Sequence, residues 1–368
     1  MNPETDERRG RISMSRLDRV SECAGSVNAE RDIPEPPSSD VASMGTRCHE
    51  GMETQSFQCL ANDDERKAVE IAMELEASVV GAWLEEVAPD ANVADCTIIR
   101  EERLWGLDDR VSGKADLVVI CDAHALVVDY KFGRGAVTEA VGNLQLRGLA
   151  VLVKEDNPEL HSVTVAIIQP WVSPQTSVCH YALEDLVIAR DHVERILDES
   201  ENPDALRRPS AKACQYCKAA ATCPEAQATA LALVQDDPAQ LPAERLPDLL
   251  ELAAVAEKAL AKRIAAIKAR ARELIEANPN AIDGWELKDG RTTRAVAESG
   301  PAFEALANAG LIDAKGMLAA TKVSLPTLEK QVAQFAELKS KDAKAQVADV
   351  LSDQIEIKTG TQMLAKKK

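Results

Sequence analysis

Residues 113–133 place charged side chains at the ends of two apolar segments, in the sequence GKADLVVICDAHALVVDYKFG. Both segments have the length and the Val, Ile and Leu content of buried strands. Burying a charge is costly unless a partner compensates it, so Asp116, Asp129 and Lys131 require an explanation. Their residue types could bind a divalent cation and assist hydrolysis.

The polar break at Ala123-His124 predicts an antiparallel hairpin in which Asp116 lies opposite Lys131 and Val118 lies opposite Asp129. Asp129 and Lys131 are two residues apart, so they share a face of their strand, and this pairing puts Asp116 on the same face. The hairpin therefore predicts two carboxylates and an ammonium group at one end of a sheet.

Such a group suits metal-assisted hydrolysis of a phosphodiester. Mg²⁺ and Mn²⁺ prefer carboxylate oxygens and keep several waters. The ion polarises the phosphoryl oxygen and helps generate hydroxide, and a nearby lysine offsets charge that grows in the transition state. The alternative is a cross-strand Asp–Lys pair, which stabilises an exposed strand end by less than about 1 kcal/mol.

Gly113-x-x-Asp116 followed by Asp129-Tyr130-Lys131 resembles two motifs of the RecB-like branch of the PD-(D/E)XK nuclease superfamily. That branch has a histidine on an upstream helix and a Q-x-x-x-Y helix downstream, and GTRCHEG and NLQLRGLA supply His49 and Gln145. Asp129 stands where members more often have Glu, and Leu149 where the pattern has Tyr.

The resemblance implies a role for each matching residue. His49, Asp116, Asp129 and the Tyr130 carbonyl would bind Mg²⁺ or Mn²⁺, Lys131 would act in catalysis, and Gln145 would hold the substrate or the lysine. It also implies an α/β fold with a restriction-endonuclease-like core, in which helices flank a mixed central sheet. Without these motifs, His49 and Gln145 would be ordinary helix residues.

Three of the nine cysteines form a tight group with the spacing C-x₂-C-x₅-C, and the scattered Cys48, Cys59, Cys96, Cys121 and Cys179 are interpreted as core residues. The group comprises Cys214, Cys217 and Cys223, and a tetrahedral site needs a fourth ligand. Members of the same nuclease branch hold a [4Fe-4S] cluster with this trailing set and one earlier cysteine, for which Cys23 is the candidate. Zinc, or no metal, remains an alternative.

Composition limits the class of protein. With 368 residues and 45% hydrophobic residues, the chain is expected to fold, and the N-terminus lacks an apolar targeting segment. We expect no membrane span and a cytoplasmic location, which is the host cytoplasm if the protein is phage-encoded. A net charge of −18 argues against nonspecific coating of nucleic acid but allows a local basic groove.

Two regions are predicted: a nuclease domain over 1–232 and a mainly helical extension over 233–368. The extension begins with a helix over 247–277, followed by a hairpin around Asp289-Gly290. One stripe of this helix carries basic residues that could follow a DNA backbone, although a solvated face explains them equally: Lys258, Lys262, Lys268 and Arg272.

The order of nuclease core and helical tail is similar to that of a phage-encoded family of unknown function. The resemblance implies a metal-dependent DNA nuclease, more specifically an exonuclease, that acts in phage recombination or DNA end processing. Its partners would be DNA and a phage single-strand-annealing protein, and a homo-oligomer is compatible with it. The alternative is a noncatalytic DNA-binding or assembly protein that keeps the fold.

Overall fold

The computed structural model describes residues 10–35, 40–135, 137–172, 176–233, 241–288, 299–311, 314, 316, 328–329, 332–333, 336 and 340–350. It divides into two compact units, Met1–Leu287 and Lys288–Lys368. The predicted hairpin at Asp289-Gly290 lies outside the described residues.

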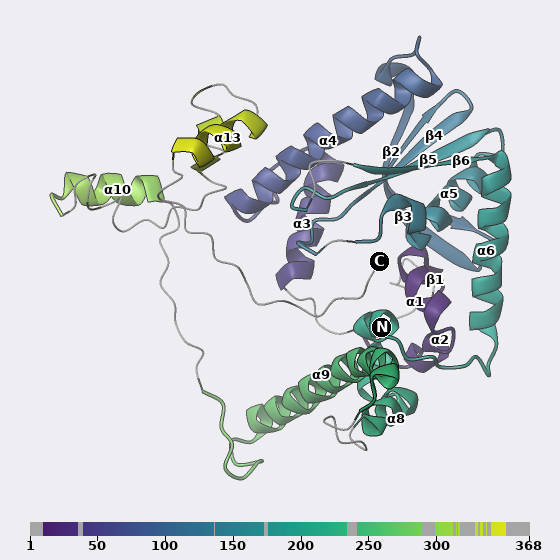
Figure 1. Ribbon diagram of the computed structural model, residues 1–368, viewed down its shortest axis with the longest axis vertical. Coiled ribbons are helices and arrows are strands. Elements are labelled where there is room, and N and C mark those ends of the chain that lie inside the picture. Colours follow the sequence, from purple (N-terminus) through teal and green to yellow (C-terminus); the bar gives the residue numbers. More distant parts are fainter. Residues whose placement is uncertain are drawn as a thin grey trace. The chain divides into compact units, whose positions relative to one another are not determined.

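A six-stranded mixed sheet forms the centre of the first unit (Figure 1). Its strands are β1 (Ile12–Ser13), β2 (Thr97–Gly106), β3 (Val111–Cys121), β4 (His124–Tyr130), β5 (Ser162–Ile168) and β6 (Ser177–Ala182). The order is β1-β3-β4-β5-β6, and β2 pairs with β3. The β1–β3 and β4–β5 pairs are parallel and the others are antiparallel.

Helices cover both faces of this sheet (Figure 1). The two on one face are α3 (Asp40–Thr54) and α4 (Asp63–Val87), and the two on the other are α5 (Leu144–Asp156) and α6 (Leu183–Glu201). Each face has its own apolar cluster, because β4 alternates between them: Leu126 and Val128 pack toward α4, whereas Ala125 and Val127 pack toward α5. The predicted α/β fold with helices flanking a mixed sheet is confirmed.

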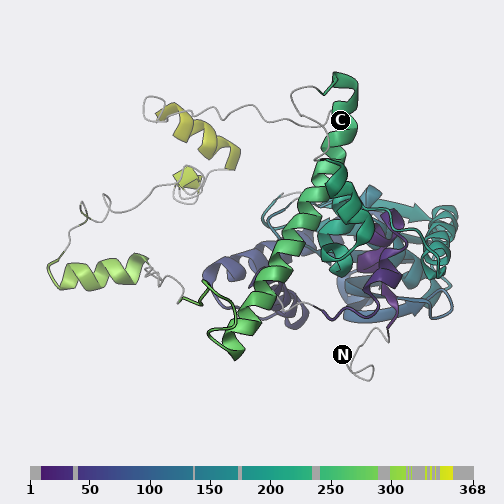
Figure 2. The same cartoon turned by 90° about the horizontal axis from the view of Figure 1, so that it is seen from below.

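Further helices complete the first unit. They are η1 (Met14–Arg16), α1 (Leu17–Glu22), α2 (Ser26–Glu30), η2 (Val93–Asp95), η3 (Ala140–Gly142), α7 (Ala211–Tyr216), η4 (Lys218–Ala221), α8 (Pro224–Ala232), η6 (Ala243–Arg245) and the long α9 (Leu246–Ala277). α9 packs along α8 and also contacts α7 and η4 (Figure 2). Residue 232, the end of the predicted nuclease domain, therefore lies inside the first compact unit.

The C-terminal unit contains α10 (Ser299–Asn308) and α13 (Ser340–Val350), as the predicted helical extension requires. None of the helices in the described part of the chain combines the length and the apolar content that crossing a bilayer requires.

The hairpin register differs from the predicted one by two residues. Cys121 pairs with His124 around a turn at Asp122-Ala123, and Leu117 pairs with Val128. Asp122 closes the turn with a positive φ of 52°, which Asp tolerates better than most residues. The predicted pairs Asp116–Lys131 and Val118–Asp129 are therefore wrong. A two-residue shift preserves the face of every side chain in a regular ladder.

An ion pair holds α3 against the start of α4 and so fixes the helix that carries His49. Arg47 on α3 donates from Nε and Nη2 to both carboxylate oxygens of Glu65, at 2.9 and 2.6 Å. The Glu65 carboxylate also accepts hydrogen bonds from the Ala61 backbone N–H and the Asn62 side chain, and only 2% of the side chain is exposed. The Arg47 hydrogen bond, opposed by burial, lowers the pKa of Glu65.

We expect Glu65→Gln to lower the free energy of unfolding by about 1–3 kcal/mol at pH 7, because it removes a charge-assisted hydrogen-bond network. The folded-state pKa of Glu65 lies below its unfolded value. Its contribution is therefore present above the unfolded pKa, near 4.3, and is lost as pH falls through the folded pKa. Denaturant unfolding at pH 7 and at pH 3.5 should show a smaller difference between variant and wild type at the lower pH. An equal difference at the two pH values would contradict this prediction.

Candidate active site

One imidazole and two carboxylates converge at the junction of α3, β2 and β3. His49, Glu101 and Asp116 each offer a ligand atom, and these atoms lie within 4.8 Å of one another. His49 Nδ1 is 3.2 Å from Glu101 Oε1 and 3.4 Å from Asp116 Oδ1. Their side chains are 31%, 9% and 11% exposed, so an ion from solvent could reach the group through the histidine side.

A local irregularity in the sheet brings the two carboxylates together. The β2–β3 ladder pairs Arg100 with Leu117 and Glu102 with Ala115, and neither Glu101 nor Asp116 is paired between them. Glu101 has a positive φ of 52°, a strained conformation for a residue with a long side chain. As a result Ala115 and Leu117, two residues apart, pack into the clusters on opposite faces of the sheet. Strain of this kind persists where other contacts hold it and is typical of functional sites.

Asp129, Lys131 and Gln145 form a second group beside the first. Lys131 Nζ lies 3.0 Å from Asp129 Oδ1 and 3.1 Å from Gln145 Oε1. Gln145, in the first turn of α5, also donates from Nε2 to Asp129 Oδ1 at 2.7 Å. The cap of α5 sets the position of Gln145, because the Asn143 side chain accepts a hydrogen bond from the Leu146 N–H.

The backbone connects the two groups. The Tyr130 N–H donates to Asp116 Oδ2 at 2.7 Å, and Tyr130 lies between Asp129 and Lys131 in the chain. The buried Tyr130 ring points to the α4 side, where its hydroxyl donates to Glu76, which also pairs with Arg100. The Tyr130 side chain is thereby fixed, while its main chain lies at the site.

The charges of the second group are strongly coupled. Burial, together with the negative charge of Asp116, raises the pKa of Asp129, although Lys131 and His49 act in the opposite direction. Burial tends to lower the pKa of Lys131, but the attraction of Asp129 outweighs it and the net shift is upward. Asp129 Oδ2 is buried and accepts no hydrogen bond from a described residue, although Lys131 Nζ is 2.8 Å away.

The carboxylates around the histidine favour its protonated form, and binding of a metal ion to the imidazole would displace a proton. Burial lowers the pKa of His49, but hydrogen bonds to Asp116 and Glu101 outweigh that effect and raise it to about 10. Lys114 supplies the other partner of Glu101, with Nζ 2.7 Å from Oε2. Glu101 and Asp116 thus both lie beside basic side chains.

The structure therefore brings the predicted residues together in two subsets. His49 and Asp116 lie in the carboxylate–imidazole group, and Asp129, Lys131 and Gln145 in the adjacent one. Asp129 is not part of the group whose atoms lie within 4.8 Å. Glu101 was not predicted. Its signal is the charged run Arg100-Glu101-Glu102-Arg103 in a strand beside buried β3, since four consecutive charges cannot all face solvent in a regular strand.

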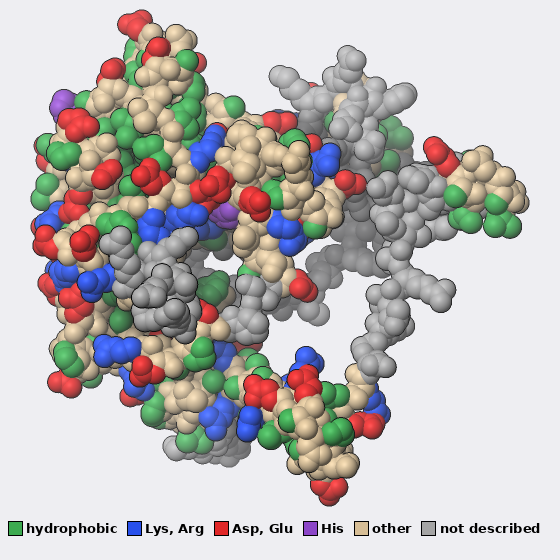
Figure 3. All heavy atoms as spheres, turned by 180° about the vertical axis from the view of Figure 1, so that it is seen from behind, with side chains coloured by type: hydrophobic (Ala, Val, Ile, Leu, Met, Phe, Trp, Pro, Cys, Tyr) green, Lys and Arg blue, Asp and Glu red, His purple; other side chains and the backbone are tan. Residues whose placement is uncertain are grey.

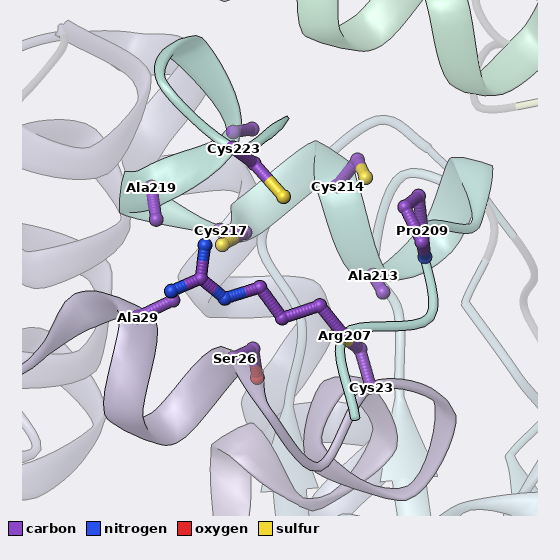
Figure 4. Close-up of a pocket in the computed structure, with 11 residues that line it drawn as sticks. Cys23, Ser26, Ala29, Arg207, Pro209, Ala213, Cys214, Cys217, Ala219 and Cys223 are labelled. Carbon is purple, nitrogen blue, oxygen red and sulfur yellow. The ribbon is translucent and has the colours of Figure 1, made fainter. Parts of the chain in front are cut away.

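The four cysteines that are predicted to bind one metal cluster all line a single cavity (Figure 4). Cys214 lies on α7, Cys217 and Cys223 bracket η4, and Cys23 follows α1. Cys214, Cys217 and Cys223 line this cavity, and the Arg207 side chain extends across it (Figure 4). None of the nine cysteines forms a disulfide.

Polar groups lie at the edges of this cavity. The Arg208 N–H donates to Cys23 Sγ at 3.2 Å, and Lys262 on α9 donates to the Cys217 carbonyl at 2.7 Å. Burial raises the pKa of the Cys217 thiol to about 11 and, less strongly, that of Cys214. Because Lys262 is used in this contact, the predicted basic stripe on α9 is not a uniform solvent-facing row.

Two solved structures show limited similarity to this chain. One is described as "Putative exonuclease" from Eubacterium rectale, with a TM-score of 0.36 and 14% identity over 55% of this chain and 88% of that one. The other is SSO0001, with a TM-score of 0.27 and 11% identity over 58% and 86%. No curated protein matches the sequence. A family model matches residues 10–368, so the chain belongs to the family described as "Protein of unknown function (DUF2800)".

Proposed function

We propose that this protein is a metal-dependent DNA nuclease whose active site is formed by the two groups around β3 and β4. The observation that carries the proposal is the convergence of His49, Glu101 and Asp116 beside the buried Asp129–Lys131 pair. Carboxylates, an imidazole and a lysine at one end of a hairpin are the groups that hydrolysis of a phosphodiester requires.

The donor set fits Mg²⁺ or Mn²⁺. Oxygen ligands dominate it, as these cations prefer, and one imidazole favours Mn²⁺ among the alternatives. Burial raises the pKa of Asp129 although Lys131 Nζ lies 2.8 Å from its Oδ2 atom, so a second positive charge nearby would stabilise this carboxylate. His49, Glu101, Asp116, Asp129 and the Tyr130 carbonyl would hold the ion, which would polarise the phosphoryl oxygen and lower the pKa of water.

Lys131 would orient the attacking water and offset negative charge on the phosphoryl group in the transition state. Gln145 would keep Lys131 in place, because its amide contacts both members of the Asp129–Lys131 pair. The Tyr130 N–H would hold the Asp116 carboxylate in one orientation. None of these roles requires the tyrosine that Leu149 replaces, because Gln145 is already fixed by its two contacts.

The cysteine cavity would hold a [4Fe-4S] cluster with Cys23, Cys214, Cys217 and Cys223 as ligands. Four cysteines line one cavity, which is the number of ligands that such a cluster needs, and the Arg208 N–H near Cys23 Sγ is a donor of the kind that stabilises thiolate sulfur. Binding would require the Arg207 side chain, which extends across the cavity, to turn away. Its role would be structural, since it would join the segment after α1 to the end of the nuclease core. Zinc is the competing occupant.

The type of nuclease, its biological role and its partners are inferred from this proposed chemistry and from the resemblance of the motifs to RecB-like nucleases. We propose an exonuclease that processes DNA ends in phage recombination, with DNA and a phage single-strand-annealing protein as partners in the host cytoplasm, and a homo-oligomer is compatible with it. A noncatalytic protein with the same fold would bind DNA but leave it intact.

The proposal is tested by incubating the wild-type protein with DNA in Mg²⁺, in Mn²⁺ and in EDTA. Single-stranded and duplex oligonucleotides, each labelled at the 5′ or the 3′ end, distinguish an exonuclease from an endonuclease and give its polarity. We expect product only with metal. Intact DNA under every condition, with DNA still bound, would identify the noncatalytic alternative.

Glu101→Gln should weaken Mn²⁺ binding at least about tenfold, because it removes a charged oxygen ligand from the site. Glu102→Gln is the matched control: it removes the same charge from the next residue, whose side chain is exposed. Electron paramagnetic resonance of free Mn²⁺ measures both affinities. If the two variants bind Mn²⁺ equally well, Glu101 is not a ligand.

A further inference from the structure

A pocket with a basic lining lies beside the candidate site. It is lined by residues of β1, η1, β2, β3 and α5, namely Ser13, Met14, Ser15, Arg103, Lys114 and Gln145. The lining provides two cationic groups, two hydroxyls and an amide, and it contains no acidic side chain. Such a set of donors is suited to an anion.

Two residues of the lining connect this pocket to the proposed active site. Lys114 pairs with Glu101, which belongs to the carboxylate–imidazole group. Gln145 contacts Asp129 and Lys131, which form the other group. The pocket is therefore adjacent to both halves of the site.

The pairing of β2 and β3 places like charges directly opposite each other at this point. Arg103 and Lys114 are cross-strand partners in the ladder. Like charges in such positions repel each other, Glu101 offsets part of this repulsion at Lys114, and an anion in the pocket would add to that effect. The Arg103 guanidinium is oriented by the Ser112 hydroxyl, 3.2 Å from Nη1, and Ser15 Oγ lies 3.1 Å from Ser13 Oγ. These contacts fix the groups that an anion would meet.

The charge on the rest of the protein bears on where DNA could be attracted. The chain has a net charge of −18, so most of its surface repels a polyanion. On the face shown in Figure 3, Lys and Arg side chains are interspersed with Asp and Glu side chains around a histidine. A site for an anion in such a protein has to be supplied by a local group of cations.

We propose that the pocket formed by Ser13, Ser15, Arg103 and Lys114 binds a backbone phosphate of the DNA strand adjacent to the phosphate that is cleaved. The proposal rests on the proposed nuclease function for its choice of ligand. Arg103 supplies the main charge, Lys114 connects the phosphate to Glu101, and the two hydroxyls donate hydrogen bonds. The pocket positions the strand, while the chemistry takes place at Lys131 and the acids.

The test uses the full chain and oligonucleotides in which one phosphate at a time is replaced by an uncharged methylphosphonate. Affinities are measured by fluorescence anisotropy with Ca²⁺, which takes the same oxygen ligands as Mg²⁺. We expect one position where the replacement weakens wild-type binding about tenfold, as for loss of a charge-assisted contact. Arg103→Met should bind unmodified DNA about tenfold more weakly and should lose sensitivity at that position alone.

Arg195→Met, which removes an exposed arginine of α6 outside the pocket, is the matched control and should keep the wild-type pattern. Ser15→Ala changes only one exposed hydroxyl, and it should weaken binding severalfold if Arg103→Met does not fold. An Arg103→Met variant that folds and keeps full sensitivity at every position would overturn the pocket assignment. Because binding is measured without cleavage, this result is independent of whether the protein hydrolyses DNA.

Discussion

Lys131→Ala is expected to reduce DNA cleavage by about a thousandfold while leaving DNA binding within a few fold of wild type. Removing a group that stabilises transition-state charge costs about 10²–10³ in rate, and here the loss also leaves the buried Asp129 without its cation. The measurement is the initial rate of release of labelled nucleotide in Mg²⁺, with affinity measured in Ca²⁺.

Lys67→Ala is the control, since it removes an exposed lysine from α4, away from the site. It should cleave at the wild-type rate. Because Lys131→Ala leaves Asp129 buried without its ion pair, circular dichroism and thermal unfolding should show that the variant is folded before its rate is interpreted. A folded Lys131→Ala protein that cleaves at the wild-type rate would remove Lys131 from the mechanism.

Cys23→Ser is expected to abolish the iron–sulfur cluster and to destabilise the first compact unit by about 3–5 kcal/mol. The estimate treats the cluster as a cross-link between Cys23 and the distant Cys214–Cys223 segment, by analogy with a disulfide that closes a long loop. Wild-type protein purified without air should be brown and contain iron and acid-labile sulfide in equal amounts. The variant should lack both and unfold at a lower denaturant concentration.

Cys96→Ser is the control for this experiment, because Cys96 is a partly exposed thiol of another part of the unit. It should retain iron, sulfide and wild-type stability. A colourless wild-type protein with one equivalent of zinc would replace the cluster by a zinc site. A brown Cys23→Ser protein with full iron content would show that the fourth ligand is another residue.

The sequence predicts which residues come together at the candidate site more accurately than it predicts their geometry. Asp116, Asp129 and Lys131 stand out because charged residues at the ends of Val-rich strands are costly, and the motif spacing adds His49 and Gln145. The register could not be obtained in this way. The turn at Asp122-Ala123 depends on a positive φ at an aspartate, and the sequence contains no Asn-Gly or Asp-Gly signal there.

Glu101 shows a second limit of sequence reasoning. Its place in the site depends on an interruption of the β2–β3 ladder, where Glu101 takes a left-handed backbone conformation. A regular period of two assigns each strand residue to a face, and that assignment fails where the period is interrupted. The short β1 was also missed, because two residues carry no periodic signal, although this strand brings Ser13 to the basic pocket.

The long helix predicted over 247–277 is observed as α9, Leu246–Ala277. What periodicity could not show is the partner of each face. α9 packs on α7 and α8, and so Lys262 reaches the cysteine group instead of the solvent.

The most direct test of the central claim is a crystal of the wild-type protein grown with Mn²⁺ and measured at a wavelength where manganese scatters anomalously. We expect an anomalous peak for a manganese ion that is bonded to His49, Glu101 and Asp116, and we expect the Asp129 side chain to turn from Lys131 toward this ion. Absence of a peak at saturating Mn²⁺, or a peak bonded to none of these side chains, would contradict the account.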